Sequence, residues 1–86
     1  MSSFTRGLDA LVAQLDPEAH ADEIQVLRRC RSLRDLDRVA DAGGWLTGPG
    51  PPERLKLIKH RSGTYLVVRY EEGWSTRLAI QEFARR

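Results

Sequence analysis

Few side chains in this sequence have the type and spacing that catalysis requires. The chain has one cysteine, Cys30, and two histidines, His20 and His60. A thiolate nucleophile needs a base beside it, but His20 lies too far before Cys30 along a helix to activate the thiol. Cys30 also lies on an apolar line of residues, where we expect it to be a small buried hydrophobe. We therefore expect no enzymatic activity and no catalytic residue.

Metal and phosphate sites are not indicated either. His20, Asp22 and Glu23 are crowded together but lack the i,i+4 spacing of helical metal ligands, and they fit an exposed first helical turn. Ser62 precedes a glycine, as is usual in turns. Gly48-Pro49-Gly50 superficially suggests a phosphate loop, but proline lacks an N–H donor and no helix N-terminus follows. We expect neither a metal nor a cofactor.

Charge is distributed unevenly along the chain, although the formal net charge is only +2. Residues 1–27 carry one arginine and five acids, whereas residues 54–70 carry five cations and no acid. Such asymmetry is a better guide to partners than the total charge. The candidate partner-binding residues are the cations of this basic segment and two nearby aromatic residues: Arg54, Lys56, Lys59, Arg61, Arg69, Tyr70 and Trp74.

The basic segment has two interpretations. Cations interleaved with an aromatic side chain are typical of phosphate contact combined with base stacking. Lysine and arginine also protect exposed strands against pairing with other chains. If Leu55 and Leu57 face the helices, their neighbours face outward; these are Arg54, Lys56, Ile58 and His60. The sequence does not determine the register with the following strand, so both interpretations stay open.

Helical spacing of apolar residues predicts a helix over 4–15. Asp16-Pro17-Glu18 is typical of a helix start, and a second helix is predicted over 17–30. From Ile24 to Val39, apolar residues recur every three positions, a line that drifts around a single straight helix. A break at Arg31-Ser32 resolves this, because Ser32 and Asp35 match a capping box. A third helix then covers 33–42 and ends at Gly43. One continuous bent helix is the alternative.

The second half of the chain reads as a loop followed by strands. Residues 44–53 are rich in Gly and Pro, and we expect Trp45 and Leu46 to fold back onto the preceding helix. Residues 54–60 and 64–70 form a predicted hairpin, with Gly63 in the left-handed position. A third strand from Trp74 is favoured over a C-terminal helix capped at Ser75. Residues 82–86 are expected to be a tail or a last helical turn.

The expected fold is a single α+β domain over residues 1–86. Two or three N-terminal helices (1–43) pack on one face of a small antiparallel β-meander of two or three strands (54–86), with the loop 44–53 between them. A chain of this size has only a modest core. No apolar run approaches the ~20 residues of a membrane helix. With no signal-like N-terminus and a lone cysteine, we expect a soluble, cytoplasmic protein without a membrane partner.

Two architectures would suit nucleic acid. Three helices followed by a hairpin is the element order of a winged helix, with 33–42 as recognition helix and 59–63 as wing tip. Against this, Asp35, Asp37 and Asp41 leave that helix close to neutral.

The segment from Gly63 to Gly73, with the sequence GTYLVVRYEEG, is similar to the central hairpin of small RNA-cleaving toxins that join two helices to a basic meander. That resemblance implies RNA cleavage as an alternative activity. This chain departs from the pattern, because no strand precedes the first helix and the tail Phe83-Ala84-Arg85-Arg86 lacks the acid–base histidine or tyrosine.

The leading hypothesis is a small non-enzymatic regulatory or adaptor protein that binds another macromolecule, most often a protein. Trp45, Tyr70 and Trp74 are its candidate anchors, since aromatic residues are enriched at interfaces. The alternative is nucleic-acid binding through the basic hairpin 54–70. Homodimerisation is also expected to be feasible, because an open meander edge offers a pairing surface.

Overall fold

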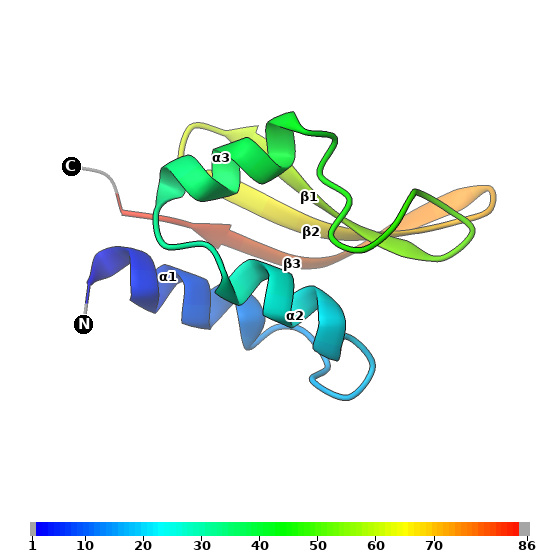
Figure 1. The fold of residues 1–86 in the computed structure, drawn as a ribbon, viewed down its shortest axis with the longest axis horizontal. Helices are drawn as coiled ribbons and strands as arrows, with labels where there is room; N and C mark the ends of the chain where they lie inside the picture. The colour runs from blue at the N-terminus through cyan, green and yellow to red at the C-terminus, as the bar shows by residue number, and fades with distance from the viewer. Residues whose placement is uncertain (1, 85–86) are drawn as a thin grey trace.

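The computed structural model describes residues 2–84, which form three helices followed by three strands (Figure 1). The antiparallel strands follow chain order, β1-β2-β3. This confirms the expected α+β fold. The last element is a strand, so the alternative prediction of a C-terminal helix capped at Ser75 is wrong. The elements are α1 (Ser3–Val12), α2 (Ala21–Arg28), α3 (Leu33–Asp41), β1 (Arg54–Arg61), β2 (Thr64–Glu71) and β3 (Trp74–Glu82).

Helix α2 begins four residues later than the sequence pattern predicted. The carboxylate of Asp16 accepts hydrogen bonds from the backbone N–H groups of Glu18 (2.9 Å) and Ala19 (3.4 Å). These bonds stabilise a turn, and the N–H of His20 donates to the Asp16 carbonyl at 2.9 Å. The predicted start at Pro17 is therefore wrong, because Asp16 caps a turn instead of a helix.

The predicted break between the second and third helices is confirmed. Ser32 is the N-cap of α3, and its hydroxyl accepts from the N–H of Asp35 at 3.4 Å. The Asp35 carboxylate accepts in return from the N–H of Arg31 at 2.8 Å, one residue before the position that a standard capping box uses. Gly43, at φ +104°, ends the helical region in the left-handed conformation, as expected.

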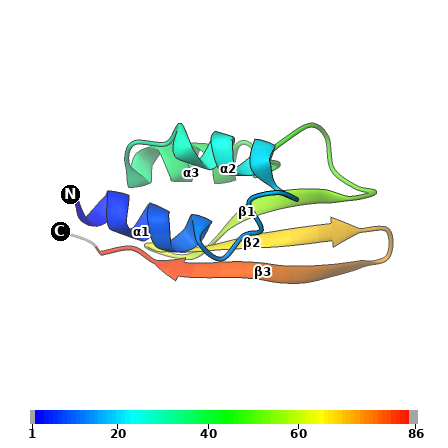
Figure 2. The same cartoon turned by 90° about the horizontal axis from the view of Figure 1, so that it is seen from below.

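All three helices lie on one side of the sheet (Figure 2). Helix α1 packs beside β3 and α3 beside β1. Alternate strand residues point into the layer between helices and sheet, where they are buried at no more than 2% exposure; these are Leu55, Leu57, Tyr65, Val67 and Ala79. Leu11, Leu27 and Leu36 fill the same layer from the three helices. Among residues 2–84, no helix covers the opposite face.

The segment after β3 is more than a tail. Phe83 is 2% exposed, its ring stacks on Phe4 at 5.6 Å, and its edge meets Tyr65 at 5.6 Å. Its N–H donates to the carbonyl of Gly63 at 2.7 Å. The expected last helical turn is absent at Phe83 and Ala84, and the rest of that prediction, 85–86, lies outside the described residues.

The outer edge of β1 is partly covered by the segment around Trp45. The N–H of Leu46 donates to the carbonyl of Leu55 (3.0 Å), and the N–H of Leu57 donates to the carbonyl of Gly44 (2.7 Å). Leu46 enters the core, but Trp45 pairs with β1 instead of folding onto the helix end as predicted. Within residues 2–84, no helix is long and apolar enough to cross a membrane.

Candidate functional site

The strand register divides the hairpin residues between two faces of the sheet. Lys56 lies opposite Val68, and Val68 lies opposite Arg77, so these three side chains form one row across the sheet. The next row contains Ile58, Leu66 and Ile80. We call the side away from the helices the open face; it contains Trp45, Arg54, Lys56, Ile58, Leu66, Val68, Tyr70, Ser75, Arg77 and Ile80.

The open face holds apolar side chains that do not contribute to the core. Among the described residues, every buried hydrophobic side chain belongs to one core cluster except Val68. Ile58 and Leu66 are half-buried without packing against that cluster, and Ile80 is 40% exposed. Neighbouring apolar side chains that lie outside the core, as these do, are a feature of interaction sites.

Lys56 is held at one corner of the open face by two aromatic rings. Its ammonium nitrogen lies 5.1 Å from the ring centre of Trp45 and 5.8 Å from that of Tyr70. The two rings meet edge to face at 5.4 Å. Gly50 packs so closely on the indole that a Cβ there would lie 2.8 Å from the ring. This packing fixes the Gly/Pro loop over Trp45 and orients the Lys56 cation, as cation–π contacts do.

Three of the predicted partner-binding residues lie on the other face, toward the helices. Lys59 is 3.2 Å from the carboxylate of Asp37 on α3. The Nε of Arg69 is 3.2 Å from the carboxylate of Glu71, although it lacks the alignment of a hydrogen bond. The guanidinium of Arg69 also lies 5.6 Å from the ring centre of Trp74, which is 51% exposed.

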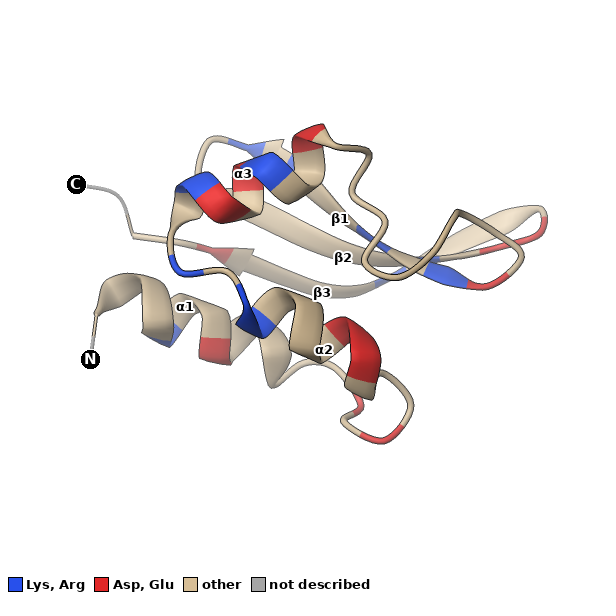
Figure 3. Ribbon diagram, viewed as in Figure 1, with Lys and Arg blue, Asp and Glu red and all other residues tan. Residues whose placement is uncertain are grey.

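The remaining predicted cations, Arg54 and Arg61, have different surroundings. Arg54 donates from Nε to the carbonyl of Pro49 at 3.1 Å and from Nη1 to that of Glu53 at 3.2 Å, so its guanidinium holds the loop. Arg61 is exposed at the hairpin turn. Lysine and arginine are spread over several elements (Figure 3), so the basic segment does not make one basic face.

Cys30 has the surroundings of a core residue. It is 7% exposed, and burial, with a smaller contribution from the carboxylate of Asp35, raises the pKa of its thiol above the ordinary value. A thiol with a raised pKa is a poor nucleophile near neutral pH. Within residues 2–84, no three side chains of metal-ligating type gather in one place.

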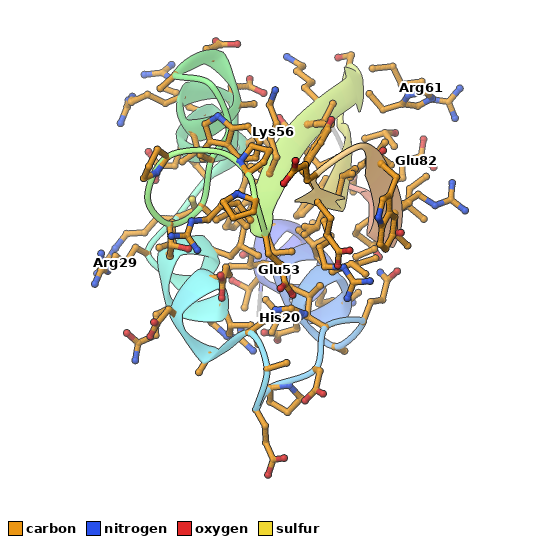
Figure 4. All side chains as sticks on the ribbon, turned by 90° about the vertical axis from the view of Figure 1, so that its right-hand side faces the viewer. His20, Arg29, Glu53, Lys56, Arg61 and Glu82 are labelled. Atoms are coloured by element: carbon orange, nitrogen blue, oxygen red, sulfur yellow. The ribbon has the colours of Figure 1, made fainter. Side chains whose placement is uncertain are left out.

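The helical side of the described residues has hollows, of which two involve α2. One, of about 370 Å³, is formed where α2, the Gly/Pro loop and the sheet meet, and His20 and Glu53 lie near each other there (Figure 4). Arg54 and Arg69 also line it, together with Glu23, so its cations and carboxylates balance. The other, of about 470 Å³, is a shallow groove between α2 and α3.

Most of the apolar part of the open face was not predicted from the sequence. Lys56 and Tyr70 were predicted as candidates, but Leu66, Val68 and Ile80 were not. One signal was present: β2 alternates two apolar sets, Tyr65 with Val67 and Leu66 with Val68, although a single helical layer can cover only one set.

Comparison with known proteins gives no match to a family model, a curated protein or a solved structure.

Proposed function

We propose that this domain is a small non-catalytic regulatory or adaptor module that binds a protein partner through its open face. The observation that carries the proposal is the row of Ile58, Leu66 and Ile80, which neither joins the core nor is covered by a helix. A three-stranded sheet buries its apolar residues by packing against another layer. On this face, that second layer would be supplied by the partner.

The composition of the open face supports a protein partner. Protein interfaces combine an apolar centre with aromatic residues and arginine and have few acids at the centre. Val68 and Leu66 provide the centre, Tyr70 an aromatic side chain and Arg77 a peripheral cation. The candidate anchor Trp74 is exposed but lies at the β2–β3 turn on the other face, beside Arg69.

Site-specific photocrosslinking tests the proposal. Ile80→benzoylphenylalanine places the crosslinker on the open face, and Arg34→benzoylphenylalanine, on the exposed side of α3, is the matched control. In cells of the source organism, we expect a protein adduct from position 80 and none from position 34. Adducts from position 34 alone, or none from position 80, would contradict the proposal.

Nucleic-acid binding is the second candidate, favoured by one observation: none of Lys56, Arg61 and Arg77 has a carboxylate partner among the described residues. Fluorescence anisotropy with labelled random-sequence DNA and RNA tests it, because phosphate binding weakens steeply as salt rises. The variant K56E/R61E/R77E should then abolish binding. Lys59 is kept unchanged in this variant because a glutamate there would place a second carboxylate beside that of Asp37.

A further inference from the structure

We propose that the partner segment is an acidic amphipathic α-helix that lies along β2 on the open face. This inference rests on the proposed function and specifies the chemistry of its ligand. Three features of the molecule support it: the width of the open face, the positions of its cations and the state of the sheet edges.

The width of the open face matches one helix. Lys56 and Arg77 lie on β1 and β3, each directly opposite Val68 on β2. Two strand spacings separate them, about 10 Å. An α-helix with its side chains is about 10–12 Å across. A helix over Val68 would therefore have one cation along each flank.

The length of the open face also suits a helix. Strand β2 spans eight residues, and its alternate side chains Leu66, Val68 and Tyr70 form an apolar line along it. Eight strand residues extend over roughly 26 Å, which corresponds to about 18 residues of α-helix. The apolar stripe of an amphipathic helix would cover this line, as helices α1 to α3 cover the other face.

The charges of the open face select an acidic partner. Lys56 and Arg77 flank Val68, whereas the guanidinium of Arg54 is held by the carbonyls of Pro49 and Glu53. Among the described strand residues on this side, the one carboxylate is that of Glu82, at the end of β3. Figure 4 shows Glu82 beside Arg61 on one side of the molecule, with Arg29 on the opposite side. Carboxylates on both flanks of the partner helix would complement Lys56 and Arg77.

A second copy of this chain fits the face less well. Two open faces packed together would bring two sets of cations into one interface, and like charges at an interface are costly. Nucleic acid also fits less well, because the Trp45 indole is already contacted by Gly50, by the Tyr70 ring and by the Lys56 ammonium, which leaves little ring surface for a base.

The sheet edges favour docking across the face over addition of a strand. The segment around Trp45 pairs with part of the β1 edge, and the side chain of Gln14 occupies the backbone groups of Ile80 on β3. The part of β1 beyond that pairing contains Lys59, His60 and Arg61, and charged side chains discourage edge pairing.

Two designed peptides test the inference with the intact protein. One is an amphipathic helix of about 18 residues built from Leu, Ala and Glu, and the other has Lys at every Glu position. We expect the acidic peptide to bind roughly tenfold more tightly than the basic one at low salt. Backbone amide NMR shifts should fall on Leu66, Val68 and Tyr70. The variant K56E/R77E should reverse the preference, whereas the control R29E/R34E, on the helical side, should keep it.

Equal affinity for both peptides, or shifts confined to α2 and α3, would overturn the inference. An unchanged preference in K56E/R77E would overturn it as well. These outcomes are distinguishable from failure of the proposed function, because crosslinking from position 80 does not depend on the charge of the partner. A protein adduct at position 80 whose crosslinked segment is neither helical nor acidic would leave the proposed function standing and reject the acidic helix.

Discussion

The side-chain amide of Gln14 pairs with the backbone of Ile80 as a neighbouring strand would. Its Nε2 donates to the Ile80 carbonyl at 2.8 Å, and its Oε1 accepts from the Ile80 N–H at 3.1 Å. One residue in the turn after α1 thus occupies both outward-facing backbone groups at this point of the β3 edge. This covering protects the sheet against pairing with other chains at this point of the edge.

The variant Gln14→Leu should release this edge. Because three exposed hydrogen bonds are lost, two to Ile80 and one to the Ala10 carbonyl, the free energy of unfolding should fall by about 1–2 kcal/mol. Hydrogen exchange of the Ile80 amide should become fast while the amides of β2 stay protected. Gln25→Leu, at an exposed position of α2 whose side chain has no hydrogen bond, is the control. Equal effects of the two substitutions on stability and exchange would refute the role of Gln14.

The two faces of the sheet should respond differently to the same substitution. Leu57 is 1% exposed and faces the helices, so Leu57→Ala should lower the free energy of unfolding by about 2–5 kcal/mol. Leu66 is half-buried on the open face, and Leu66→Ala should cost about 1 kcal/mol. Urea denaturation of both variants measures the difference. If the costs were equal, both faces would be packed in the isolated protein and the open face would not exist.

The start of α3 should depend on the hydroxyl of Ser32. Ser32→Ala removes the acceptor for the Asp35 N–H, and loss of an N-cap costs about 0.5–2 kcal/mol. The 3.4 Å distance of this bond places the expected cost at the lower end. Ser3→Ala, in the first turn of α1, removes a hydroxyl that makes no hydrogen bond, and should change the unfolding free energy little. A larger loss in Ser3→Ala than in Ser32→Ala would contradict the assignment.

Cys30 should make the stability of the protein depend on alkaline pH. Burial raises the pKa of its thiol above the ordinary value of 9.0, so the unfolded chain loses this proton at lower pH than the folded chain does. The contribution of Cys30 is therefore fully present below pH 9.0 and is lost as pH rises from there through the folded-state pKa.

Denaturation of the wild type and of Cys30→Ala across this pH range measures the effect. The difference in unfolding free energy between them should shrink above pH 9.0. The thiol should also resist alkylation at neutral pH until the protein unfolds. A difference that stayed constant with pH, or rapid alkylation of the folded protein, would show that the thiol is accessible.

Much of the fold could be predicted because local signals agree with it. The break at Ser32 follows from apolar residues at intervals of three. The hairpin follows from Gly63, which lies between two segments rich in strand-forming residues and adopts φ +82°. The start of α2 could not be predicted, because Asp16 suits a helix cap and a turn equally well. The importance of Phe83 was also missed, since its aromatic contacts come from Phe4 and Tyr65, both distant in sequence.

The candidate site was less predictable than the fold because it depends on register. Alternation predicted that Lys56 faces outward, but which β2 residues share its face depends on the pairing of Lys56 with Val68. That pairing places Tyr70 with Lys56 and separates both from Lys59 and Arg69. The distinction between a basic hairpin and a mixed apolar face thus comes from cross-strand pairing, which a sequence pattern does not specify.

The measurement that tests the open face most directly is a methyl NMR spectrum of the protein with and without the partner that crosslinking from position 80 identifies. The methyl groups of Ile58, Leu66 and Ile80 should shift on binding, while those of Leu11, Leu27 and Leu36 in the core stay in place. Shifts confined to methyl groups of the helical side, such as Val26 and Val39, with the open face unchanged, would contradict the account.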